Sequence, residues 1–229
     1  MRPVMGRMLI MLTGLCLLGT AAKADTVIAD NLDSGGSYNT GFSWGINGTS
    51  NPFSLPAISE ATDFTSSGNF TLSQLFIPLA FAGPFVSPTI TGDVDISIAA
   101  DDGGLPGTSL ESWSVDVPQG NGLFDLSDTT GLVLTAGTTY WIVASPASDT
   151  TFAGWNFNDT DASGAMAVNV GGVWLPVDLA ASNCGPDPCA LPAFEVTGNA
   201  VAAPEPSSLL LMGIGLLGIT FLRRKYEDG

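Results

Sequence analysis

The stretch Asp93-Val94-Asp95-Ile96-Ser97-Ile98 decides the fold class of this chain. Polar and apolar residues alternate one for one along it, which is the period of a β-strand with one wet face and one buried face. An amphipathic helix would instead repeat its apolar residues every three or four positions. Residues 93–98 therefore predict an antiparallel strand that covers a core.

The same kind of pattern extends in both directions from this stretch. Short apolar and β-branched runs alternate with Gly- and Pro-rich turns, and no helical period persists over about 12 residues. The predicted strands are Thr26–Asn31, Gly41–Ile46, Glu60–Thr65, Phe70–Phe81, Asp93–Ala99, Leu110–Val117, Gly122–Leu126, Gly131–Leu134, Thr139–Ala144, Thr151–Phe157, Ala165–Val170, Val173–Val177 and Ala193–Thr197. Strands at this spacing predict an all-β, antiparallel, jelly-roll-like β-sandwich over residues 25–198.

Four segments of this region occur in a characteristic order. Phe64 begins FTSSGNFTLSQLFIPLAF, Asp93 begins DVDISIAADDGGLPG, Leu134 begins LTAGTTYWIV, and Gly172-Val173-Trp174 follows. This order resembles the choice-of-anchor domains, in particular the group called choice-of-anchor R, over most of residues 28–178. The resemblance implies a jelly-roll-like sandwich placed ahead of a surface-sorting signal, and it implies no activity.

The distribution of charge excludes several function classes. The chain has 229 residues, 22 Asp and Glu, 6 Lys and Arg, no His, and a formal net charge of −16 at pH 7. No basic residue lies between Lys23 and Arg223. That region therefore cannot neutralise nucleic-acid phosphates, supply an imidazole for Ser-His-Asp catalysis, or bind zinc through histidine. We expect no nucleic-acid partner.

The N-terminal residues 1–24 have the parts of a secretory signal peptide. Two arginines precede the apolar run Met8–Leu18, and Ala22 and Ala24 then occupy positions −3 and −1 of a cleavage site. Cleavage by the secretion machinery would leave Asp25 as the first residue. The alternative is an uncleaved membrane anchor, for which the apolar run is short.

The C-terminal residues 204–229 have three parts in a fixed order. Pro204-Glu205-Pro206 comes first, the apolar run Ser207–Leu222 follows, and Arg223 and Arg224 come directly after it. A helix of this run would be about 24 Å long, against a hydrocarbon core of roughly 30 Å, so it predicts a short transmembrane helix. The arginines would stay cytoplasmic by the positive-inside rule. An ordinary single-span anchor is the alternative.

These three parts resemble the PEP-CTERM sorting signal of exopolysaccharide-producing Gram-negative bacteria. The resemblance implies processing by exosortase, a membrane-embedded cysteine transpeptidase-like enzyme, at or near Pro204-Glu205-Pro206. The inner-membrane anchor would then be transient, and residues 25–204 would reach the cell surface or the extracellular matrix. Residues 199–203, which are mostly small, are predicted to be a linker that gives the enzyme access.

The loop Asp101-Asp102-Gly103-Gly104-Leu105-Pro106-Gly107 allows two interpretations. Asp, Gly and Pro are turn residues, so the first is a surface connection between two strands. The second is a calcium site, because calcium takes six to eight oxygen ligands and Asp101 and Asp102 are adjacent carboxylates. Calcium is the one candidate cofactor, and the spacing is not that of an EF-hand.

Cys184 and Cys189 are the two cysteines that remain after signal-peptide removal. In an oxidising compartment, two cysteines on either side of a Pro-rich loop predict a disulfide. The alternative is a soft-metal pair, for which further ligands are missing.

Three functions are compatible with these features. The first is a non-enzymatic surface or matrix protein associated with exopolysaccharide or biofilm. The second is a carbohydrate-binding module for the cell's own exopolysaccharide, which would require two or more tryptophans exposed on one face. The third is a glycosidase with paired carboxylates, for which no pair stands out.

The acidic composition also predicts a response to pH. Residues 25–204 carry 19 acids and no basic side chain. Carboxylates surrounded by like charges should have raised pKa values in the folded state, so stability should fall as pH rises.

Overall fold

The computed structural model describes residues 25–51, 53–81, 89–160, 162–180, 182 and 189–201. Over these residues the chain forms strands and turns and contains no helix. The strands are β1 Thr26–Asp30, β2 Ser43–Asn47, β3 Ile58–Thr65, β4 Phe70–Phe81, β5 Asp93–Asp101, β6 Pro106–Asp116, β7 Gly120–Ser127, β8 Val133–Leu134, β9 Thr139–Pro146, β10 Phe152–Asn156, β11 Met166–Val170, β12 Val173–Val177 and β13 Glu195–Ala200. The predicted all-β class is confirmed.

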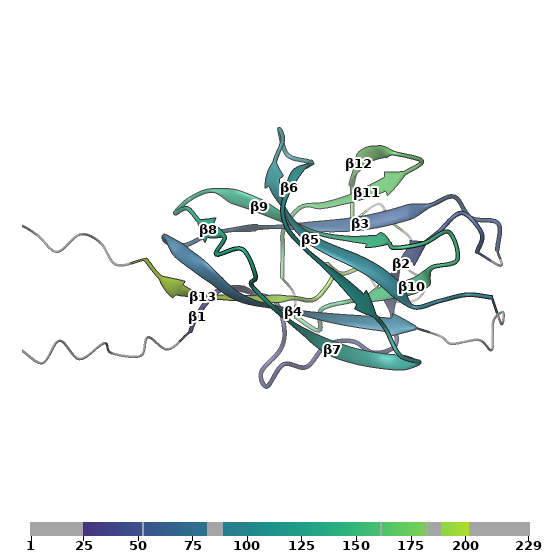
Figure 1. Cartoon of the computed structure of the whole chain (residues 1–229), viewed down its shortest axis with the longest axis horizontal. Helices are drawn as coiled ribbons and strands as arrows, with labels where there is room; N and C mark the ends of the chain where they lie inside the picture. Colours follow the sequence, from purple (N-terminus) through teal and green to yellow (C-terminus); the bar gives the residue numbers. More distant parts are fainter. Residues whose placement is uncertain are drawn as a thin grey trace, which may run out of the picture.

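The strands form one continuous antiparallel sheet that curls into two facing layers (Figure 1). In one layer β4 is central, with β13 and β10 along one edge and β7 and β8 along the other. In the second layer the order is β12-β11-β3-β9-β5-β6. The layers join where β2, which pairs with β10, meets β3 through the single pair Asn47 and Ile58. This architecture is the predicted β-sandwich.

The core lies between the two layers and is built from alternate residues of the long strands. Fully buried side chains contributed by β2, β4, β5, β9 and β10 are Ile46, Leu75, Ile77, Leu79, Val94, Ile96, Ile98, Ile142 and Trp155. Each large apolar side chain that is buried in this way contributes roughly 1.5–3 kcal/mol to folding. The alternation in residues 93–98 is confirmed, because Val94, Ile96 and Ile98 are the inward residues of β5.

A second, smaller apolar cluster covers the outer face of the second layer. It contains Trp141 and Val143 of β9 with Ala61, Ala99 and Ala167 of the neighbouring strands. Leu105 of the β5–β6 connection and Trp174 of β12 pack against it. Strand β9 is therefore buried on both faces, which explains why residues 140–143 are continuously apolar.

Two predicted boundaries are corrected by the pairing. Strand β6 begins at Pro106 and not at Leu110, because β5 bulges around Ala99 and stays paired through Asp101 and Pro106. Strand β13 continues through Ala200, because Asn199 and Ala200 pair with the first residues of β4. The first two residues of the predicted linker 199–203 therefore belong to the sheet.

Among the described residues there is no helix long and apolar enough to cross a membrane. The predicted signal peptide, with Ala22 and Ala24, lies outside the described residues. So do Pro204, Glu205, Pro206, Arg223, Arg224 and the predicted transmembrane helix.

Candidate functional site

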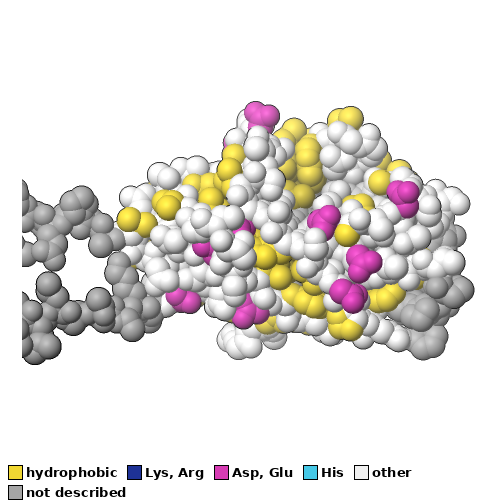
Figure 2. All heavy atoms as spheres, in the orientation of Figure 1, with side chains coloured by type: hydrophobic (Ala, Val, Ile, Leu, Met, Phe, Trp, Pro, Cys, Tyr) yellow, Lys and Arg dark blue, Asp and Glu magenta, His cyan; other side chains and the backbone are white. Residues whose placement is uncertain are grey.

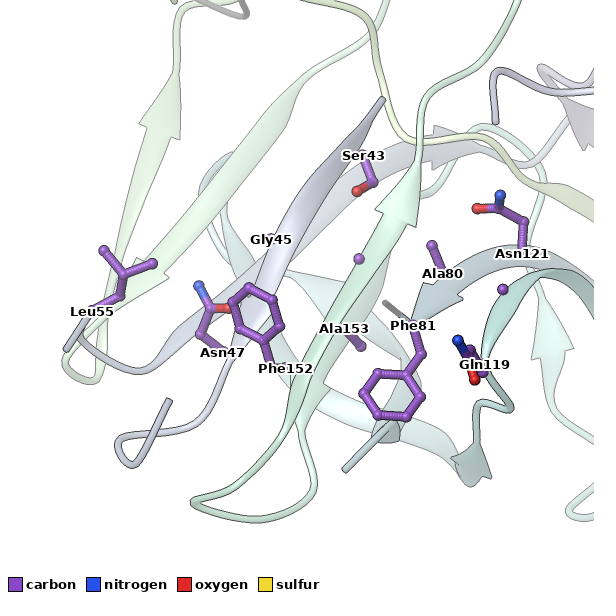
Figure 3. A pocket seen from close by; sticks show the side chains of 12 residues that line it. Ser43, Gly45, Asn47, Leu55, Ala80, Phe81, Gln119, Asn121, Phe152 and Ala153 are labelled. Carbon is purple, nitrogen blue, oxygen red and sulfur yellow. The ribbon is translucent and has the colours of Figure 1, made fainter. Parts of the chain in front are cut away.

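A groove lies at the end of the sandwich where β2, β4, β7 and β10 meet (Figure 3). Its volume is about 460 Å³, within the range of roughly 300–1,000 Å³ that is usual for small-molecule sites. We call it the distal groove, and the residues that define its chemistry are Gly45, Asn47, Phe81, Gln119, Asn121 and Phe152.

The floor of the distal groove is made by residues without bulky side chains. Gly45 of β2 pairs with Gly154 of β10, and Gly154 pairs with Ala80 of β4. A Cβ added to Gly154 would lie 2.8 Å from the Cβ of Ser43, so this position excludes a side chain. A Cβ on Gly45 would find its nearest atom, Nδ2 of Asn47, 3.4 Å away, so Gly45 leaves open space. Gly45 therefore creates the hollow, whereas the side chain of Ser43 takes the space over Gly154.

Amide side chains surround this floor. Asn47 is 3% exposed and lines the groove, and its Oδ1 has no hydrogen-bond partner among the described residues. Asn121 projects from β7, and its Oδ1 accepts a hydrogen bond of 3.1 Å from Nδ2 of the buried Asn156. Gln119 is exposed at the rim. The groove thus offers both hydrogen-bond donors and acceptors without a charge.

Two phenylalanine rings complete the groove (Figure 3). Phe81, at the end of β4, is half-buried and packs against the main core. Phe152 of β10 is half-buried, and the ring of Phe53 lies 5.3 Å from it between centroids. No Asp or Glu is among the described residues that line the groove, although 19 acids lie in residues 25–204.

The tryptophans do not form an exposed platform. Trp141 and Trp155 are fully buried, and the half-buried ones are Trp44, Trp113 and Trp174. The indole of Trp155 donates a 2.8 Å hydrogen bond to the carbonyl of Ala193, and that of Trp141 donates one of 2.8 Å to Oδ1 of Asp101. The indoles of Trp44 and Trp113 donate to backbone carbonyls in the same way. These indoles connect segments of the sandwich. None of the five tryptophans is exposed, so the exposed tryptophans expected of a carbohydrate-binding module are missing.

The loop that contains Asp101 and Asp102 is a tight connection between β5 and β6. The amide of Asp102 donates to the carbonyl of Leu105 at 2.8 Å, and Gly103 and Gly104 have positive φ, which glycine tolerates best. Both carboxylate oxygens of Asp101 accept hydrogen bonds from the amide of Gly104. This is the predicted surface connection. No group of three or more acidic or cysteine ligands occurs within the described parts of the chain, and calcium binding stays a prediction.

Acidic side chains are scattered over the surface without basic neighbours (Figure 2). Burial is the main cause that raises the pKa of Asp63 and Glu195, and Asp101 and Asp30 respectively add like-charge repulsion. Burial alone raises the pKa of Glu60 to about 8. The pKa values of these three groups are shifted in the predicted direction, but burial is the main cause, and like charge contributes only to Asp63 and Glu195.

The pKa of Glu111 is shifted in the opposite direction, below its usual value. Burial would raise its pKa, but hydrogen bonds from the hydroxyls of Thr130 and Thr129 and from the amide of Thr129 outweigh burial and lower it. Its carboxylate therefore ties β6 to the turn after β7, and like-charge repulsion does not govern it.

The two ends of the sandwich differ in what they present. Strand β1 pairs with β13, so the described chain begins and ends at the same end of the molecule (Figure 1). Ala200 pairs with Phe70, the first residue of β4, and Phe81, the last residue of β4, lines the distal groove. Eleven residue steps at about 3.4 Å each separate these two ends by roughly 37 Å. The C-terminal segment therefore leaves the sandwich far from the groove.

The segment that follows this exit point matches a known sorting motif. Residues 202–225 match the PEP-CTERM protein-sorting motif. A comparison with curated proteins finds no match to this chain. The PEP-CTERM motif begins one residue after Val201, whose amide still donates to the carbonyl of Asn69 at 2.9 Å.

The PEP-CTERM motif implies export, anchoring in the membrane during processing, and exosortase as the processing enzyme. It contains the predicted sorting residues, which are Pro204, Glu205, Pro206, Arg223 and Arg224. The sandwich and the sorting motif that the choice-of-anchor resemblance implies are both present, whereas the resemblance to that group itself stays a prediction.

Two other predicted sites lie at the limits of the described residues. Asp25, the predicted first residue after signal-peptide cleavage, precedes β1, and its Oδ1 accepts hydrogen bonds from Ser73 at 2.9 Å and from Asn199 at 3.0 Å. Cys189 is half-buried and Cys184 lies outside the described residues, so the disulfide stays a prediction.

The distal groove was not predicted from the sequence. Gly45 and Gly154 lie inside predicted strands, and an interior glycine is a known signal of close approach by another group. The sequence therefore contains one signal of the groove. It does not show the strand pairing that brings Asn47, Phe81 and Asn121 together.

Proposed function

We propose that this chain is an exported, non-enzymatic protein of the cell surface or extracellular matrix, associated with exopolysaccharide. The observation that carries the proposal is the PEP-CTERM motif directly after the last strand of a sandwich. Exosortase would remove the C-terminal anchor, and the product would be roughly residues 25–204.

Side-chain chemistry supports the non-enzymatic part of the proposal. Residues 24–222 contain no Lys, Arg or His, so acyl-transfer and phosphoryl-transfer sites lack their usual groups. Within the described part of the chain, the lining of the distal groove includes no carboxylate that could act as a general acid or base.

A second candidate function is a carbohydrate-binding module for the cell's own exopolysaccharide. The observation that favours it is the distal groove, with its amides and rings at the end opposite to the exit of the chain. Calcium could assist through Asp101 and Asp102, but Asp101 ends β5, Asp102 follows it in the turn to β6, and neither lines the groove.

Fractionation of the producing bacterium tests the proposal. Wild-type protein should be found in the matrix fraction in a shortened form, and deletion of exosortase should leave the full chain in the membrane fraction. Replacing Pro204, Glu205 and Pro206 by alanine should have the same effect, whereas the control Ser207→Ala should be processed normally. Equal matrix fractions in all strains would contradict it.

A further inference from the structure

The shape of the distal groove is suited to a flat, ring-sized group. Gly45 and Gly154 lie side by side on β2 and β10, and Ala80 continues the same floor on β4. Because the floor is made only of backbone, the methyl group of Ala80 and the small side chain of Ser43, a ligand can approach the sheet closely between the rings of Phe81 and Phe152.

The polar groups of the groove match a ligand with several hydroxyls. An amide side chain can donate and accept at the same time, as a sugar hydroxyl also does. The buried Asn47 has an oxygen without a partner among the described residues, and a buried unpaired oxygen is costly until a donor reaches it. The side chain of Asn121 is held in place by two hydrogen bonds: its Oδ1 accepts from Nδ2 of Asn156 at 3.1 Å, and its Nδ2 donates a long one of 3.5 Å to the carbonyl of Thr40.

Charge decides which polyhydroxylated ligands fit. The groove has no Lys, Arg or His to pair with a carboxylate, sulfate or phosphate, and none occurs in residues 24–222. The surrounding domain is strongly negative and repels anions at short range, within about 8 Å at physiological salt. The groove itself carries no acid, so an uncharged ligand meets no unpaired charge in it.

We infer that the distal groove, formed by Gly45, Asn47, Phe81, Gln119, Asn121 and Phe152, binds an uncharged sugar unit of a polysaccharide. The ring faces of Phe81 and Phe152 contact the C–H surface of the sugar, and the amides contact its hydroxyls. This inference rests on the proposed association with exopolysaccharide and adds the site and the class of sugar. Its position, roughly 37 Å along β4 from the exit of the PEP-CTERM segment, keeps it accessible while the chain is anchored.

Binding of the full-length chain to immobilised polysaccharides tests this site. The full-length chain includes the predicted transmembrane helix, so it is kept in a detergent that has no sugar headgroup. The neutral probes are dextran, mannan and mixed-linkage β-glucan, and alginate is the anionic probe. Wild type should bind at least one neutral probe and not alginate. Gly45→Val should fill the floor and weaken that binding at least tenfold. A Cβ meets no atom closer than 3.4 Å there, and the unfolding midpoint of the variant is measured to establish that it folds.

Two further variants separate a binding role from a structural one. Asn121→Ala should weaken binding several-fold, and Thr108→Val, on an exposed position of β6 outside the groove, should bind as wild type does. Binding to alginate alone, binding to no probe, or equal binding by wild type and Gly45→Val would overturn the inference.

The same variants separate this inference from the proposed function. Co-sedimentation of wild type and Gly45→Val with the producer's exopolysaccharide would support the association but overturn the groove as its site. Binding of a neutral probe that Gly45→Val abolishes, without sedimentation of wild type, would support the groove and overturn the association.

Discussion

Replacing Glu60 by glutamine should stabilise the protein at neutral pH and leave it nearly unchanged at acid pH. Glu60 is 3% exposed on β3, and its Oε2 has no hydrogen-bond partner among the described residues. Alternation along β3 places it on the same face as Phe64, which packs in the main core. Burial of the charged form raises its pKa from 4.5 to about 8.

The size of the effect follows from these two pKa values. The unfolded chain releases the proton near pH 4.5, whereas the folded chain keeps it until pH is about 8. The free energy of unfolding therefore falls as pH rises between these values and levels off outside them. At about 1.4 kcal/mol per pH unit, Glu60 costs roughly 3 kcal/mol at pH 7. A typical domain has only about 5–15 kcal/mol in total.

Urea unfolding from pH 4.5 to pH 8 measures this effect. Wild type should lose stability over that range, and Glu60→Gln should lose roughly 3 kcal/mol less of it by pH 7. At acid pH the buried carboxyl is protonated and is as unpaired as the amide of glutamine, so the two proteins should have nearly the same stability there. Asp116→Asn, which removes an exposed charge on β6, is the control. Parallel curves for wild type and Glu60→Gln would refute the reasoning.

Three other perturbations have definite expected outcomes. Glu111→Gln should lower the free energy of unfolding at pH 7 by about 2–4 kcal/mol, because a carboxylate that accepts three hydrogen bonds is lost. Since its pKa is lowered, that difference should shrink as pH falls below about 4.5, and urea titration at pH 3 and 7 checks this. Gly48→Ala should cost on the order of 3 kcal/mol by thermal unfolding, because its Cβ would collide with the carbonyl of Asp149. Reductant should lower the melting temperature of wild type but not of Cys184→Ser/Cys189→Ser, since the short loop closed by the predicted disulfide is worth at most about 2–3 kcal/mol.

The positions of the strands could be predicted because apolar and β-branched runs give way to turn residues at their ends. Strands β4 and β12 begin and end where predicted, at Phe70–Phe81 and Val173–Val177, since polar turns with Gly or Asn precede both. The start of β6 was wrong because a bulge in β5 allows Pro106 to pair, and proline alone suggested a turn.

The candidate site could not be predicted because it depends on which strands become neighbours. Asn47 and Asn121 are far apart in the chain and reach the same groove only because β2, β10, β4 and β7 are adjacent. Local patterns do not encode that order. The expectation that tryptophan would bind the sugar was also misleading, because Trp141 and Trp155 are buried and their indoles donate hydrogen bonds within the sandwich.

The mature C-terminus of the protein tests the central claim most directly. Intact-mass analysis of protein from the extracellular fraction should give a chain that begins at Asp25 and ends at or near Pro204. Cells without exosortase should yield a chain that still ends at Gly229. A chain ending at Gly229 in the extracellular fraction of wild-type cells would contradict sorting through the PEP-CTERM motif.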